Sequence, residues 1–170
     1  MVTLRHFTRD DADTIQEMMY PSISREEIDQ VLGEWAELSY QGKYFEMLAV
    51  ESDGRIVGNI SLFEQREHIA SIGIEIFPGE RRNGFAAEAM TLLCKKASGL
   101  GYEIIVDEIR ADNTASLKLH EKLGFESTGP HGVRFLRRVH CRRHYYFPYY
   151  YCDQHYYRTA RHGIGIPNSI

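Results

Sequence analysis

The sequence predicts one mixed α/β domain with a central β-sheet flanked by helices. Apolar residues alternate with polar ones in several short segments, of which Ile69–Phe77 is the clearest, and they recur at helical spacing in others, such as Ile28–Leu38. The chain has 170 residues, of which 43% are hydrophobic and 26% charged. This length and composition suit a single domain with its own core.

The N-terminal part is expected to contain one strand and two helices. The pattern of Thr3–Phe7 is typical of a strand. Thr8, followed by two acidic residues, is a candidate N-cap for a first helix. Ser24 with Glu27 three positions later forms a capping box, which predicts a second helix that continues to Leu38.

Three strands are predicted next, over Phe45–Val50, Arg55–Phe63 and Ile69–Phe77. Asp53-Gly54 predicts a hairpin turn between the first two, and Pro78-Gly79 ends the third.

The second half predicts a helix, a strand and another helix, over Gly84–Leu100, Glu103–Arg110 and Asn113–Leu123. Extended structure is expected from Phe125 onward, with two final strands before Tyr151. The predicted order is therefore β-α-α-β-β-β-α-β-α-β.

Composition and charge exclude several classes of protein. No apolar run reaches the ~20 residues that span a bilayer, and residues 1–6 lack a signal-peptide core, so we expect a cytoplasmic protein with no membrane partner. The net charge of -4 is unevenly distributed, because arginines gather after residue 130 and the preceding part is acidic. An acidic domain attracts a cationic substrate such as an amine rather than nucleic acid.

Residues 140–170 are rich in Tyr, His and Arg and show no helical or alternating pattern. We separate them as a C-terminal extension from a domain over 1–139, and the last strand could come from the extension. The pairs Cys141–His144 and Cys152–His155 resemble halves of a zinc site, but such pairs arise by chance in so biased a region, and we expect no metal. An aromatic contact in a homodimer is another interpretation of this extension.

The turn before the helix at residue 84 is predicted to bind an anion. Free backbone N–H groups at the positive end of the helix dipole suit a pyrophosphate. Gly84 lets the backbone approach a ligand closely, Ala86 keeps a neighbouring position small, and Arg81 and Arg82 add charge-assisted donors. The alternative is an ordinary helix start with a solvated basic corner.

Two motifs together resemble the GNAT superfamily of acyl-CoA-dependent N-acyltransferases. The family motif Gln/Arg-x-x-Gly-x-Gly/Ala is matched by Arg81, Gly84 and Ala86. A second motif, Leu-Tyr-Glu-Lys-Leu-Gly-Phe, is matched by Leu119–Phe125, with His120 in place of the tyrosine. The nearest branch in general appearance acetylates protein N-termini and small amines.

The resemblance covers Thr3–Gly129 and implies both a fold and a cosubstrate. The family's sheet splays open between its fourth and fifth strands, and the pantetheine arm of acetyl-CoA lies in the gap. The backbone of Ile76 and Phe77 would hydrogen-bond this arm, and the Asn113 amide would contact it, with Ser116 of the same motif assigned to cofactor binding. Residues 81–86 would surround the diphosphate, and these include Arg82, Asn83 and Phe85.

The implied reaction is direct attack of a primary amine, on a small molecule or a peptide, on the thioester in a ternary complex. The Ile76 N–H would stabilise the oxyanion. His120 would be the acid that protonates the leaving thiolate, or alternatively a helix-surface histidine without a chemical role. Glu75, acting through water, would be the base, or alternatively an exposed strand charge.

Two other functions remain open. A non-catalytic acyl-CoA sensor on the same fold would explain the missing tyrosine and the absence of an acid at Ala70 or Ser71, where many relatives carry one. A zinc-binding or nucleic-acid-binding module would explain the basic extension. Candidate acceptors are a protein N-terminus, a polyamine, an aminoglycoside and an amino acid.

Overall fold

The computed structural model describes residues 1–110, 112–127 and 134–138. The strands are β1 (Val2–His6), β2 (Ser39–Tyr40), β3 (Lys43–Ser52), β4 (Arg55–Arg66), β5 (Ile69–Ile76), β6 (Ile104–Glu108), β7 (Glu126–Ser127) and β8 (Arg134–Arg138). The helices are α1 (Ala12–Met18), α2 (Arg25–Ala36), α3 (Phe85–Gly99) and α4 (Thr114–Lys122).

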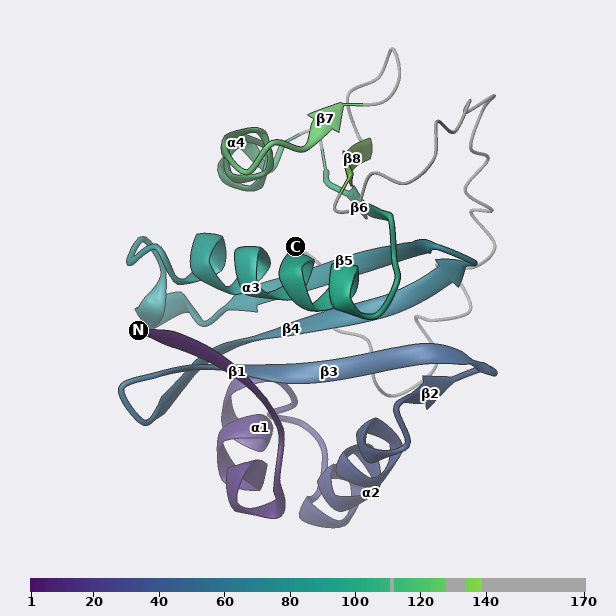
Figure 1. Ribbon diagram of the computed structural model, residues 1–170. Coiled ribbons are helices and arrows are strands. Elements are labelled where there is room, and N and C mark those ends of the chain that lie inside the picture. The colour runs from purple at the N-terminus through teal and green to yellow at the C-terminus, as the bar shows by residue number, and fades with distance from the viewer. Residues whose placement is uncertain (111, 128–133, 139–170) are drawn as a thin grey trace.

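The strands form a mixed sheet in the order β1-β3-β4-β5-β6-β8-β7, with β2 paired to β3. Only the β5–β6 pair among these neighbours is parallel. The helices α1 and α2 lie on one side of the sheet, and α3 covers β4 and β5 on the other (Figure 1). The predicted class, a mixed α/β fold with a central sheet flanked by helices, is confirmed.

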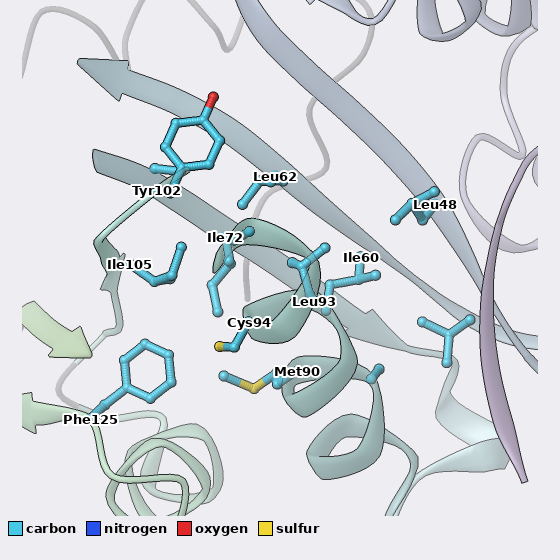
Figure 2. Close-up of a cluster of buried hydrophobic side chains, with 14 of the residues drawn as sticks. Leu48, Ile60, Leu62, Ile72, Met90, Leu93, Cys94, Tyr102, Ile105 and Phe125 are labelled. Atoms are coloured by element: carbon cyan, nitrogen blue, oxygen red, sulfur yellow. The ribbon is translucent and has the colours of Figure 1, made fainter. Parts of the chain in front are cut away.

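The larger hydrophobic core lies between the sheet and α3. Leu48, Ile60, Ile72 and Ile105 come from four adjacent strands and pack with Leu93 of α3 (Figure 2). Because successive side chains of a strand point to opposite faces of the sheet, only every second residue of each strand can face α3. The alternation of apolar and polar residues in the sequence therefore indicates which residues of each strand lie on the face that α3 covers.

A second core lies between the sheet and the pair α1 and α2. Ile15 and Ile28 are fully buried here, and Trp35 packs with Phe45 and Phe63 in the same cluster. The predicted capping box at the start of α2 is present, since Ser24 and Glu27 exchange hydrogen bonds. This cluster holds both helices against the face of the sheet that α3 leaves uncovered.

Several boundaries differ from the predictions. A 3-10 turn over Arg9–Asp11, capped by Thr8, precedes α1. The helix α2 ends at Ala36 rather than Leu38, because Leu38 takes a left-handed conformation with φ 51°. The short strand β2 was not predicted.

Gly58 allows the end of β5 to approach β4 unusually closely. A Cβ atom at this position would lie 2.1 Å from the Glu75 carbonyl oxygen and 3.0 Å from the Ile76 Cα. Gly58 and Ile76 are cross-strand partners. The missing side chain thus lets the last residues of β5 lean toward β4, which is the direction away from β6.

Glu46 is a buried carboxylate that joins β1, β3 and α3. Its Oε1 lies 2.6 Å from His6 Nε2 and 3.0 Å from Lys96 Nζ, and the Tyr44 hydroxyl donates to its Oε2 at 2.8 Å. Burial alone raises the pKa of Glu46, but the hydrogen bonds from these three partners outweigh burial and hold the pKa below its ordinary value.

Replacing Glu46 with Gln is expected to lower the free energy of unfolding by about 2 kcal/mol at pH 7. Because the pKa is lower in the folded chain, the ionised carboxylate stabilises the fold above the unfolded pKa, and this stabilisation is lost as pH falls through the folded pKa. Urea unfolding of both proteins at pH 7 and at about pH 3 tests this. The wild-type advantage should shrink at the lower pH, and an equal advantage at both would contradict the assignment.

The predicted extension over residues 140–170, its boundary at residue 139 and both Cys–His pairs lie outside the described residues. Within the described part of the chain, no helix combines the length and apolar character that a bilayer crossing requires.

Candidate functional site

A gap opens between β5 and β6. Their pairing ends at Ser71 and Val106, although β5 continues to Ile76 and β6 to Glu108. The first half of β5 is buried, and its second half, from residue 73 onward, is partly exposed. Within the described residues, no strand pairs with the end of β5 on the side of β6. The end of β5 therefore has backbone groups on this side that no neighbouring strand of the described residues pairs with.

The register of β4 and β5 shows which backbone groups face this gap. Ile76 lies opposite Gly58, and the next residue, Phe77, donates its N–H to the Val57 carbonyl at 3.0 Å. Successive residues of an antiparallel strand direct their polar groups to alternate sides. The N–H and C=O groups of Ile76, and of Ile74 before it, therefore point away from β4 and toward the gap.

The backbone polar groups of Phe77, unlike those of Ile76, do not face the gap. Its amide is bonded to Val57, its carbonyl accepts from the Glu80 amide at 2.8 Å, and its side chain is buried. The backbone contact that we expected from Ile76 and Phe77 is thus narrowed to the Ile76 N–H, because both polar groups of Phe77 and the Ile76 carbonyl already have partners within the protein.

The turn between β5 and α3 contains backbone N–H groups that are available to donate hydrogen bonds to a ligand. Arg82 and Gly84 both take left-handed conformations, with φ 68° and φ 84°, and Gly84 is the N-cap of α3. No described residue accepts a hydrogen bond from the backbone amides of Arg81 through Ala86. Successive N–H groups in such a turn form a concave anion site, and the helix dipole favours negative charge there.

The side chains of this turn leave that surface open. Arg81 donates from Nε to the Ile76 carbonyl oxygen at 3.0 Å, and Asn83 donates to the Glu80 carbonyl oxygen at 3.2 Å. Arg82 is exposed, whereas Phe85 and Ala86 are half-buried at the start of α3. The Arg81 guanidinium therefore lies against the last residue of β5.

Asn113 is the N-cap of α4 and lies beyond the end of β6. Its Oδ1 accepts from the Ser116 amide at 3.1 Å. None of the described residues accepts from its side-chain NH₂ group, so this group can donate to a ligand. The Ser116 hydroxyl lies 3.4 Å from His120 Nδ1, so it faces the imidazole of the same helix.

His120 is buried rather than on the helix surface, so the alternative of a surface histidine is wrong. Its exposed fraction is 0%. Nε2 lies 2.8 Å from Asp107 Oδ2, Nδ1 lies 2.8 Å from the Ser116 carbonyl oxygen, and the ring stacks edge-on against Phe125. Sequence reasoning missed Asp107, which follows the last residue of β6 that pairs with β5.

Glu75 lies on the face of β5 that α1 and α2 cover, opposite to Ile74 and Ile76. It is half-buried and accepts a long hydrogen bond, 3.4 Å, from the Asn59 amide. Burial raises the pKa of Tyr20 to about 12, with further contributions from the carboxylates of Glu75 and Glu34. The Tyr20 hydroxyl therefore lies close enough to the Glu75 and Glu34 carboxylates for their charges to act on it.

Solved structures share this fold. A spermidine N-acetyltransferase from Vibrio cholerae, described as dodecameric, is 19% identical with a TM-score of 0.67, and the match covers 81% of this chain and 94% of that chain. yncA from Salmonella typhimurium, a putative acetyltransferase solved with its cofactor acetyl-CoA, is 17% identical with a TM-score of 0.66, and the match covers 85% and 97%.

A curated relative is more similar in sequence. The SPbeta prophage-derived uncharacterized N-acetyltransferase YokL of Bacillus subtilis (strain 168) is 33% identical over 99 residues, which is 56% of each protein. The match thus spans little more than half the length of that relative. The family model described as acetyltransferase (GNAT) domain matches residues 1–126, which is most of the chain and contains the whole gap and the turn before α3. The predicted family is therefore confirmed: the chain belongs to the GNAT acetyltransferases.

Proposed function

We propose that the protein transfers an acetyl group from acetyl-CoA to a primary amine on a small molecule or a peptide. The observation that carries this proposal is the free amide surface of residues 81–86 beside the open edge of β5. A diphosphate binds the amides, and the pantetheine amides pair with the polar groups of Ile74, since the Ile76 carbonyl already accepts from Arg81. The Asn113 NH₂ group donates to the same arm from the opposite side of the gap.

The end of β5 contributes the main electrostatic stabilisation. The Ile76 N–H donates to the thioester oxygen as negative charge develops on it, and a fixed donor is more effective than water because it needs no reorientation. Holding amine and thioester together in one complex contributes the remainder of the acceleration.

The amine approaches from the side of the sheet that carries α1 and α2. Glu75 and Glu34 supply negative charge there, which favours an ammonium group. An alkyl amine is mostly protonated at pH 7, and Glu75 removes its proton through a water molecule. A solved neighbour of similar fold, the Vibrio cholerae spermidine N-acetyltransferase, was crystallised with CoA and spermine, which supports a cationic acceptor.

The experiment that tests this function is an acceptor screen with acetyl-CoA. Free CoA is measured by thiol release with polyamines, aminoglycosides, amino acids and peptides carrying a free N-terminus. Thiol release that depends on one of these amines supports the proposal. Tight acetyl-CoA binding without release for any amine would contradict it.

A second candidate function is a non-catalytic acyl-CoA sensor. The geometry that favours it is the burial of His120, whose two ring nitrogens both contact protein atoms. A sensor binds acetyl-CoA through the same turn and gap without transferring the acetyl group. The acceptor screen separates the two functions, since the sensor binds acetyl-CoA without thiol release.

Arg81→Ala is expected to weaken CoA binding about 10-fold, because one charge-assisted contact to the diphosphate is lost. The loss should diminish at high salt, since salt screens an exposed guanidinium. Calorimetric titration with CoA at low and high ionic strength measures both effects. Arg55→Ala is the matched control, because Arg55 is an exposed arginine paired with Glu80 outside the turn, and equal losses in both variants would count against the assigned role of Arg81.

A further inference from the structure

Asp107 and His120 share a single proton between them. The Ser116 carbonyl can only accept, so the His120 Nδ1 atom at 2.8 Å from it carries hydrogen. Nε2 lies 2.8 Å from Asp107 Oδ2, and two lone pairs cannot meet at this distance, so one proton lies between them. The pair is therefore neutral overall, as imidazolium with carboxylate or as imidazole with carboxylic acid.

The surroundings of the pair keep this proton in place. Burial raises the pKa of Asp107, which the hydrogen bond from His120 opposes. The Asp107 Oδ1 accepts from the Glu108 amide at 2.7 Å, and the Glu108 carboxylate further raises the pKa of Asp107. The Phe125 ring closes one side of the imidazole.

The Asp107–His120 pair also lies where the gap between β5 and β6 begins. The last cross-strand partners of β5 and β6 are Ser71 and Val106, and Asp107 is the first residue of β6 beyond them. Its side chain points to the face occupied by Ile105 and α4, because Ile105 and Asp107 are two residues apart on the strand. The shared proton is therefore held at the point where β5 and β6 begin to separate.

We infer that Asp107 is a positioning residue that keeps a transferable proton on His120, and that His120 delivers this proton to the sulfur of CoA. The inference rests on the proposed function. It explains why a histidine can stand where the related motif has a tyrosine: the tyrosine carries its own hydroxyl proton, whereas the histidine needs a carboxylate to hold its second proton.

The step is balanced as follows. When the tetrahedral intermediate collapses, the C–S bond breaks and its electron pair moves to sulfur. The Nε2–H bond of His120 breaks and an S–H bond forms, leaving imidazole beside ionised Asp107. The proton from the amine leaves through water and Glu75, and His120 takes up a proton again after CoA departs. Because the ring is fully buried against Asp107, it has to turn toward the gap for this transfer.

The test compares Asp107→Asn in two backgrounds, wild type and His120→Tyr. The Asn amide donates to Nε2 and leaves a neutral imidazole without a transferable proton. We expect kcat of Asp107→Asn to fall about 100-fold in the wild-type background, with CoA affinity within about twofold as one hydrogen bond replaces another. In the His120→Tyr background the same change should lower kcat less than about threefold, since the pair no longer shares a proton.

The pH profile gives an independent measurement. The limb of the wild-type kcat profile at high pH should change its position in both Asp107→Asn and His120→Tyr, because either substitution removes the proton that the two side chains share. Glu46→Gln, which alters a buried carboxylate outside the gap, is the control and should leave the shape of the profile unchanged.

Three results would decide against this inference or its basis. An Asp107→Asn enzyme with wild-type kcat and profile would refute the role of Asp107 and leave the proposed function intact. An equal loss of kcat in both backgrounds would mean that Asp107 acts through packing and not through a proton on His120. Wild-type protein that binds acetyl-CoA but acetylates no amine would refute the proposed function and this inference together.

Discussion

Gly84→Val is expected to abolish measurable CoA binding while the protein remains folded. Gly84 has φ 84°, where an L side chain is strained by roughly 1–2 kcal/mol. A Cβ atom here meets no protein atom within 4 Å, so the side chain projects into open space beside the free amides. It blocks the diphosphate and tilts the donors away from it, and losing two charge-assisted hydrogen bonds weakens binding at least about 100-fold.

The matched control for this prediction is Gly42→Val. Gly42 has φ 76° and equally open surroundings, but it lies in the turn before β3. Both variants should lose a similar amount of stability in thermal unfolding, whereas only Gly84→Val should lose CoA binding in calorimetry. Normal CoA affinity in Gly84→Val would show that the diphosphate does not bind at this turn.

Gly58→Ala is expected to lower turnover at least about 100-fold and to destabilise the fold by about 3 kcal/mol. The new methyl group would lie 2.1 Å from the Glu75 carbonyl oxygen, and a backbone atom cannot move aside by rotating a side chain. The end of β5 must therefore shift, which displaces the Ile76 N–H from the thioester and narrows the gap.

Gly73→Ala is the matched control for Gly58→Ala. Gly73 lies on β5, and its new Cβ atom would meet only the Ser61 hydroxyl at 3.0 Å, which can rotate away. We expect Gly73→Ala to change stability by less than about 1 kcal/mol. Turnover and urea unfolding measured on both variants separate local crowding from displacement of β5, and equal damage from the two substitutions would contradict the role of Gly58.

Local patterns were sufficient to predict most of the fold. The capping box at Ser24, the alternate isoleucines of β5 and the break at Pro78 act within a few residues, and the structure contains all three, with the isoleucines packed against the core beside α3. The short strand β2 has too few residues to show any periodicity. The early end of α2 depends on the left-handed conformation of Leu38, which no residue type in that stretch indicates.

The candidate site was predictable where it depends on one segment, as with Gly84 at the start of α3. It was not predictable where distant segments meet. The pairing of Asp107 with His120 joins β6 to α4, and the contact of Gly58 with Glu75 joins two strands. One signal was present in the sequence. Asp107 lies two residues after Ile105 in a buried strand and so points to the same face, and a buried acid requires a partner.

The central claim is that the amides of residues 81–86 and the edge of β5 bind CoA. Amide chemical shifts of ¹⁵N-labelled protein, recorded during titration with CoA, test it most directly. The largest shifts should belong to the amides of Arg82 through Ala86, together with Ile74 and Ile76. Saturable binding of CoA that leaves these amides unmoved, with the largest shifts elsewhere, would contradict the account.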